Sequence, residues 1–214
     1  MNKCEDKNIC AECGGVCCIK SGCDYFVSDF KSLKFNYLDN VLKGGYVSII
    51  ASLDFERTTG GKLIINPILS LRARNRNREI IDLLSMKTTC LSLSENGCRY
   101  SLEERPSGGA TLIPKENMNC YSEVNRLEEL QKWIPHQKTL QKLVKKYTGK
   151  NIYDKLREDV QKLFYDILAQ NFKDVSILEL TDIQNMIPLL VKVYPKEYQI
   201  ALSMSSSKKC VKIK

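Results

Sequence analysis

The sequence predicts an α+β fold in which a small cysteine-rich part with short hairpins precedes a helical C-terminal part. Six of the ten cysteines lie within the first 23 residues. Two runs rich in β-branched residues, 46–54 and 62–71, are separated by a Thr-Thr-Gly-Gly segment, which is typical of strands joined by a turn. After Cys120 the chain becomes charged, leucine-rich and free of glycine until Gly149, as expected for helices. We therefore expect a cysteine-cluster metal-binding domain at 1–121, a helical region at 122–200 and a mobile basic tail at 201–214.

The first of these parts contains one predicted helix and two predicted hairpins. Apolar residues at near-helical spacing over 26–43 stop at Gly44 and Gly45, which predicts a helix with a glycine C-terminal stop. The runs 46–54 and 62–71 predict a β-hairpin or a small sheet. Residues 90–102 predict a second, shorter hairpin around the Asn96-Gly97 turn. Whether 1–121 and 122–200 are two domains or one is left open by the sequence.

The second part is predicted to be helical throughout. One apolar stripe at helical spacing lies in 151–172, and it consists of Ile152, Leu156, Val160, Leu163, Phe164, Ile167 and Leu168. A charged, leucine-rich segment at 122–147 predicts another helix, and Ser176 with Glu179 forms a possible capping box for a third near 177–193. Proline residues at 135 and 188 are expected to interrupt or begin helical turns.

Composition and charge restrict the partners that we expect. The 214 residues are 43% apolar and carry a formal net charge of +8, which favours an anionic small molecule or a protein partner with an acidic surface. Nucleic acid is an unlikely partner because the basic residues are spread along the chain. The N-terminus has no apolar signal segment, and no apolar run is long enough to span a bilayer. We therefore expect a cytoplasmic protein without a membrane partner.

Four cysteines in nine residues are the strongest indication of function. Cys10, Cys13, Cys17 and Cys18 form the pattern C-x2-C-x3-C-C, and thiolates are preferred ligands of soft metals. The first three stand at i, i+3 and i+7, so they converge on a helix or around a turn. Cys18 points elsewhere than Cys17 because neighbouring side chains diverge. The alternatives are buried or redox-reactive thiols without metal, and, with less support in a reducing compartment, disulfides.

Three downstream cysteines are expected to complete the site. Cys90, Cys98 and Cys120 follow the first group at a long distance in sequence, and distant segments often supply the remaining ligands of a metal. We therefore expect zinc or an iron–sulfur cluster, in one polynuclear centre or in two sites. The spacing differs from the bacterial ferredoxin pattern, and a zinc ribbon would need a second C-x2-C pair. The sequence leaves the roles of Cys4, Cys23 and Cys210 open.

The combined pattern resembles a known family. C-x2-C-x3-C-C, a cysteine at position 90, the Asn-Gly-Cys turn at Cys98, and Y-S-L-E-E-R-P ending at Arg105-Pro106 resemble the YkgJ-type cysteine-cluster family. The resemblance covers about residues 10–120. It implies a zinc- or iron-chelating domain, and a related cluster in flagellin lysine-N-methylase makes group transfer conceivable. One departure is that the next cysteine after Arg105-Pro106 is Cys120, so this residue either replaces the usual ligand or belongs to a different site.

Alternating arginines suggest a site for an anionic group. Arg72, Arg74, Arg76 and Arg78 would project from one face of a strand, where guanidinium groups bind carboxylates or phosphates. The alternative is a solvated strand edge. Arg105 is a further candidate for binding an anion or orienting a cluster sulfur, and a salt bridge to a neighbouring glutamate is its structural alternative. We assign Arg72, Arg74, Arg76 and Arg105 as candidate substrate-binding residues.

Two functions follow from these features. The first is a metal-dependent group-transfer or redox enzyme whose arginines receive an anionic substrate beside the metal. The second is a non-catalytic protein-binding module in which the metal substitutes for part of the hydrophobic core. No catalytic residue is identified by the sequence.

Overall fold

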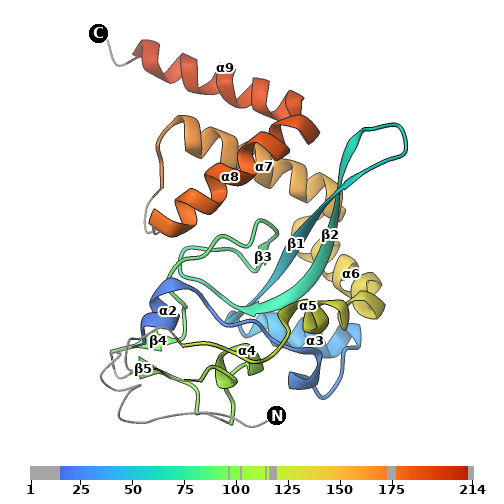
Figure 1. Ribbon diagram of the computed structural model, residues 1–214, viewed down its shortest axis with the longest axis vertical. Helices are drawn as coiled ribbons and strands as arrows, with labels where there is room; N and C mark the ends of the chain where they lie inside the picture. The colour runs from blue at the N-terminus through green and yellow to red at the C-terminus, as the bar shows by residue number, and fades with distance from the viewer. Residues whose placement is uncertain are drawn as a thin grey trace.

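A long antiparallel hairpin made of β1 (Val47–Arg57) and β2 (Leu63–Ala73) runs through the middle of the structure (Figure 1). We analysed a computed structural model, which describes residues 15–95, 97–101, 103–113, 115, 120–172 and 177–211. The register of the hairpin is continuous from Val47 opposite Ala73 to Arg57 opposite Leu63. A short third strand, β3 (Ile81–Asp82), pairs in parallel with β1, so the order in the sheet is β2-β1-β3. This confirms the predicted hairpin of 46–54 and 62–71 and makes it part of a small sheet.

The other elements surround this sheet. Helices α7 to α9 lie at one end of the molecule, and the cysteine-bearing segments α2, β4 and β5 lie at the other (Figure 1). The remaining elements are α2 (Val16–Lys20), η1 (Val27–Asp29), α3 (Phe35–Lys43), β4 (Leu93–Ser94), β5 (Gly97–Cys98), α4 (Ser107–Ala110), α5 (Arg126–Gln131), η2 (Ile134–His136), α6 (Gln137–Thr148), α7 (Ile152–Leu168), α8 (Ile177–Val193) and α9 (Pro195–Val211).

The two faces of the β1–β2 hairpin have different surroundings because side chains alternate along a strand. One face carries Ile49, Ala51, Leu69 and Leu71, which are buried in the main apolar cluster together with leucines of α3 and α6. The opposite face carries Ile50 and Ser52 on β1, and Ser70 and Arg72 on β2. Helix α5 lies over this second face, where its residues and the strand residues line a common cavity.

One apolar core joins the two halves of the chain. Buried residues from 38–86 and from 133–201 belong to a single cluster, and its largest fully buried side chains include Trp133 and Phe164. Phe164 of α7 meets Tyr198 of α9 edge-on, with ring centroids 5.2 Å apart. Asn151 caps α7 by accepting a hydrogen bond from the Asp154 backbone N–H at 2.9 Å, which stabilises the first turn. The predicted boundary near residue 121 therefore does not divide the core.

The outer edge of β2 is covered along the half that leads to the cysteines. The Gln137 side chain accepts from the Leu69 N–H at 2.9 Å and donates to the Leu69 C=O at 2.8 Å, as a neighbouring strand would. Further along, Tyr25 donates its N–H to the Leu71 carbonyl, and Ala73 donates its N–H to the Cys23 carbonyl. Satisfied edge groups protect a sheet from pairing with another chain. The segment 23–25 is thereby fixed beside the end of β2.

The structure refines the sequence expectations on secondary structure. The helix predicted over 26–43 is only α3, because the Asp29 carboxylate accepts the Phe26 N–H and closes a separate 3₁₀ turn. The helical segment predicted over 122–147 is divided into α5 and α6 at η2, which contains Pro135, as expected for this proline. The small hairpin pairs Ser94 with Gly97, so Gly97 belongs to strand β5 and not to the turn. Helix α9 continues to Val211, so residues 201–211 of the predicted mobile basic tail have a helical backbone.

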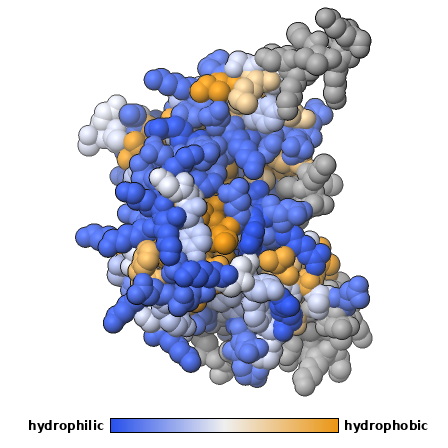
Figure 2. All heavy atoms as spheres, turned by 180° about the vertical axis from the view of Figure 1, so that it is seen from behind, coloured by the Kyte–Doolittle hydropathy of each residue, from blue (hydrophilic) through white to orange (hydrophobic). Residues whose placement is uncertain are grey.

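The surface offers no large apolar face in the view of Figure 2. Apolar residues there form small separate patches among polar side chains. The large apolar side chains that are exposed come from distant elements and include Ile19, Leu127, Ile134, Tyr153, Ile200 and Met204. No helix in the described ranges has the length and the apolar character needed to cross a membrane.

Candidate metal centre

Helix α2 presents two neighbouring cysteines in different surroundings. Gly15 precedes this five-residue helix, and its carbonyl accepts the N–H groups of Cys18 and Ile19. Cys17 is exposed and Cys18 is buried, as expected for consecutive residues of a helix. Their sulfur atoms are nevertheless only 4.0 Å apart, so the side chains reach the same region from different directions.

Backbone contacts bring two further cysteines to this helix. Cys90 donates its N–H to the Cys18 carbonyl at 2.7 Å. Cys23 is fixed by the bond from its carbonyl to Ala73 at the end of β2. The approach is so close that a Cβ atom at Gly22 would lie 1.9 Å from the Ala73 carbonyl oxygen, so only glycine fits at this position.

The thiols of Cys17, Cys18, Cys23 and Cys90 form a hydrogen-bonded group. The Cys18 thiol interacts with each of the other three, and these hydrogen bonds, together with burial, raise its pKa. The same bonds from Cys18 lower the pKa of Cys17 to about 6 and the pKa of Cys90 to about 6. Cys18 therefore holds a proton that stabilises neighbouring thiolates. Thiolates near neutral pH are both nucleophiles and metal ligands.

The segment after Arg105 packs against this group. The positive charge of Arg105 contributes to the lowered pKa of Cys17. In the short helix α4, a Cβ atom at Gly109 would lie 2.3 Å from the Cys23 sulfur, so the glycine allows the backbone to approach the thiol. Gly108 donates its N–H to the Asp24 carbonyl at 3.0 Å. The Arg-Pro-Ser-Gly-Gly segment thus holds one side of the thiol group.

A buried asparagine connects the chain segments that carry these thiols. Asn75 is 3% exposed, and its side-chain oxygen accepts the Gly22 N–H at 2.5 Å while its amide donates to the Met86 carbonyl at 3.1 Å. Its backbone also forms an isolated bridge with Cys90. Asn75 therefore ties the loop before Cys23 to the segment that carries Cys90. Asn75 lies between Arg74 and Arg76 in the alternating pattern, and its role was not predicted from the sequence.

The hydroxyl group of Ser92 is left without a hydrogen bond beside Cys90. Ser92 is 3% exposed and its oxygen has no partner that meets hydrogen-bond geometry within the described residues. It lies near enough to Cys90 to contribute to the lowered pKa of that thiol. Buried hydroxyls are normally hydrogen-bonded, and the Cys90 sulfur is the polar group that this hydroxyl acts on.

The other predicted ligands are placed differently. Cys10 and Cys13 lie outside the described residues. Cys98 lies opposite Leu93 in the small hairpin, and Leu93 packs against the buried pair Cys18 and Cys90. Cys120 precedes the bridge between Ile113 and Tyr121, with no hydrogen bond to the thiol group in the part of the chain that the structure describes.

Cys23 is the ligand candidate that the sequence left open and the fold brings in. The pairing of 23–25 with β2 places it beside the other thiols. Within the described ranges, no set of three or more histidine, cysteine, aspartate or glutamate side chains is spaced to hold a metal ion as it stands. The thiols are gathered by hydrogen bonds, and coordination would require them to approach further.

The alternating arginines Arg72, Arg74, Arg76 and Arg78 do not lie along one strand in the folded chain. Strand β2 ends at Ala73, and Asn77 has a left-handed backbone with φ of 61°. The prediction that four guanidinium groups project from one strand face is therefore wrong. Arg74 donates to the carbonyls of Arg78 and Gly45 at 2.7 and 3.2 Å, and Arg76 donates to the Leu93 carbonyl at 2.7 Å. These contacts are structural.

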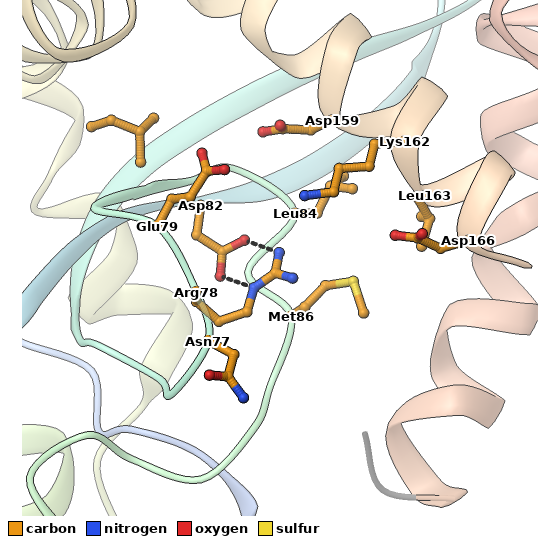
Figure 3. Close-up of a pocket in the computed structure, with 11 residues that line it drawn as sticks. Asn77, Arg78, Glu79, Asp82, Leu84, Met86, Asp159, Lys162, Leu163 and Asp166 are labelled. Carbon is orange, nitrogen blue, oxygen red and sulfur yellow. Dashed lines mark hydrogen bonds and ion pairs between the residues drawn. The ribbon is translucent and has the colours of Figure 1, made fainter. Parts of the chain in front are cut away.

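Arg72 and Arg78, the first and the last of the alternating arginines, form ion pairs. Arg72 donates from Nε to Asp24 at 2.8 Å. Arg78 donates from Nε and Nη2 to the two carboxylate oxygens of Asp82 at 3.1 and 2.6 Å, facing α7 (Figure 3). The adjacent cavity of about 50 Å³ is far smaller than a small-molecule site. There, burial raises the pKa of Asp159 to about 6, helped by the charges of Asp82 and Glu79.

Comparisons with known proteins add no family to this description. No protein-family model matches the chain, and neither the curated proteins nor the solved structures contain a match.

Proposed function

We propose that this chain is a metal-binding protein that holds zinc or an iron–sulfur centre through Cys17, Cys18, Cys23 and Cys90. The observation that carries this proposal is the convergence of four thiols from three separate chain segments into one hydrogen-bonded group. Thiolate sulfur is the ligand type that both kinds of centre prefer. The resemblance of the cysteine pattern to the YkgJ-type family supports the same assignment.

The chemistry of the donor set fits such a centre. Hydrogen bonds from Cys18 lower the pKa of Cys17 and of Cys90 to about 6, and metal binding requires thiolates and releases the remaining protons. The buried hydroxyl of Ser92 lies beside Cys90, where it would donate a hydrogen bond to a metal-bound sulfur. Cys10 and Cys13 stay predicted ligands, and they would extend the set to six in a larger cluster.

A structural role of the metal is favoured by the elements around the thiols. Helix α2 has five residues, and strands β4 and β5 have two residues each, so regular hydrogen bonding alone stabilises this end of the chain weakly. A metal ion would cross-link α2, the segment 23–25 and the segment at Cys90. It would thereby supply stability that a hydrophobic core provides elsewhere. In this version the chain is a metal-stabilised module, and its positive charge suits an acidic protein surface.

A catalytic role is favoured by one different observation. Cys17 is exposed, and Arg105, whose charge acts on it, also lines an open cavity of about 530 Å³ together with Tyr25. The cavity is also lined by Asp29, Glu103 and Glu104, so the feature that favours catalysis is the accessible sulfur with its lowered pKa and not the charge of the cavity. This version keeps Arg105 as a candidate substrate-binding residue.

Anaerobic purification followed by metal and sulfide analysis tests the proposal. We expect stoichiometric zinc, or iron with acid-labile sulfide, in the wild-type chain, and we expect Cys90→Ser to lose it. Cys210→Ser is the matched control, because α9 lies at the opposite end of the molecule from α2 (Figure 1). A wild-type chain without metal and with every thiol open to alkylation would contradict the proposal. Equal loss from both variants would mean that the metal is held elsewhere.

A further inference from the structure

A second site is suggested by the cavity between α5 and the open face of the sheet. This cavity has a volume of about 310 Å³, which lies at the lower end of the range for small-molecule sites. Its apolar lining comes from Ile50 on β1, from Tyr25, and from Leu130 and Trp133 at and beyond α5. Trp133 is 1% exposed, so an aromatic wall is fixed by the core behind it.

Polar groups without partners point into this apolar lining. Ser52 and Ser70 both line the cavity, and neither hydroxyl takes part in a hydrogen bond in the described ranges, although Ser70 is 6% exposed. The Arg72 side chain is only 11% exposed and uses Nε for Asp24 and Nη1 for Ser85. Its Nη2 has no partner within the described part of the chain. A few unsatisfied polar groups in an apolar hollow are typical of ligand sites.

The charges around the cavity favour an anion. Asp24 is neutralised by Arg72, and Glu129 is neutralised by Lys132 at 2.5 Å. Arg126, at the start of α5, also lines the cavity and is exposed, with no ion pair to any described residue. The four charged residues that line the cavity balance one another, but Asp24 and Glu129 are held by Arg72 and Lys132. Arg126 is therefore the lining guanidinium without a described carboxylate partner, and guanidinium groups bind carboxylates bidentately.

We propose that this cavity binds a small molecule with a planar apolar body and one carboxylate group. The ring lies against Trp133 and Ile50, and the carboxylate receives hydrogen bonds from Arg72, Arg126 and the hydroxyl of Ser70. The site is separate from the thiol group and its test does not depend on the metal, so the two proposals stand or fall independently. It gives Arg72 the anion-binding role that its sequence pattern suggested, without the other alternating arginines.

The single tryptophan of the chain provides a local readout. The sequence contains one Trp, and it lines the cavity, so a change in its fluorescence reports on this place alone. We suggest titrating the full chain at neutral pH with 3-phenylpropanoate, benzoate and cyclohexanecarboxylate. The neutral amide of each acid has nearly the same shape and serves as its matched control. We expect saturable binding of at least one acid and binding of its amide weaker by about tenfold or more.

Two variants identify the groups responsible. Arg126→Gln keeps the exposed start of α5 and removes the guanidinium group without a described carboxylate partner, so it should weaken binding of the acid by about tenfold and leave binding of the amide unchanged. Arg57→Gln, at the far end of the hairpin, where Arg57 contacts only the Gly61 carbonyl, should change neither. Circular dichroism verifies that both variants fold. No binding of any acid, equal binding of acid and amide, or equal effects of the two variants would overturn the proposal.

Discussion

The Gly109→Ala substitution tests whether α4 holds Cys23 in its place among the thiols. The new methyl group would lie 2.3 Å from the Cys23 sulfur and 3.0 Å from its Cβ, whereas ordinary contact begins at 3.4 Å. The sulfur must therefore move by about 1 Å, or α4 must shift by a similar distance. Forced repacking of this kind costs about 1–3 kcal/mol, and metal ligands tolerate displacements of only about 0.2 Å.

Two measurements follow from this geometry. Equilibrium unfolding in urea should show a free energy of unfolding lower by about 2 kcal/mol, which is a midpoint lower by about 1 M. Metal per chain should fall strongly in the same variant. Gly60→Ala is the matched control, because its nearest neighbour, Thr58 Oγ1, is 3.9 Å from the new methyl group. The reasoning is refuted if Gly109→Ala keeps both the wild-type midpoint and the wild-type metal content.

Three further predictions concern the scaffold, and each is measured by urea unfolding. Gln137→Ala should cost about 1–3 kcal/mol, because it leaves the N–H and C=O of fully buried Leu69 without partners. Arg78→Met should cost about 3–5 kcal/mol, because it leaves the carboxylate of Asp82, whose side chain is 4% exposed, without its bidentate partner. Hydrogen bonds from two lysines lower the pKa of Asp39 from 3.8 to about 2. This carboxylate therefore stabilises the folded state above its ordinary pKa, and the contribution is lost as the pH falls toward 2; Asp39→Asn should make that acid-induced loss smaller.

Control substitutions distinguish the loss of these specific interactions from a nonspecific loss of stability. Gln141→Ala, on an exposed turn of α6, should leave the midpoint nearly unchanged. Lys150→Met removes a pair whose partners, Lys150 and Glu158, are 44% and 53% exposed, so its effect should stay below about 1 kcal/mol. Lys146→Met removes the strongest hydrogen bond to Asp39 and should reduce the same acid-dependent step. An unchanged pH profile in both the lysine and the aspartate variant would contradict the assignment.

Secondary structure is predictable from the sequence in segments whose structure depends on residues close to one another in the chain. The apolar stripe predicted over 151–172 is α7, with Leu156, Val160 and Phe164 buried. The alternating β-branched runs form the β1–β2 hairpin with a continuous register. Both depend on a periodicity that each segment carries by itself. The small hairpin was also expected, but the identity of its turn depends on the pairing of Ser94 with Gly97.

The errors occur where a distant contact overrides a local pattern. The predicted helix over 26–43 loses its first part because Phe30 packs between Tyr25 and Trp133, at centroid distances of 5.3 and 5.8 Å. The alternating arginines look like a strand, but the Asn75 side chain is used to bind Gly22 and Met86. A hydrogen bond to a residue far away in sequence has no local signature.

The sequence by itself determined which chemistry the chain can offer. The density of thiols, the departure from ferredoxin spacing and the even spread of positive charge follow from residue types and distances along the chain. The tertiary structure alone decided which thiols meet. Cys23 joins Cys18 and Cys90 because backbone hydrogen bonds at the end of β2 bring their segments together, and such pairings are selected by the free energy of the whole fold.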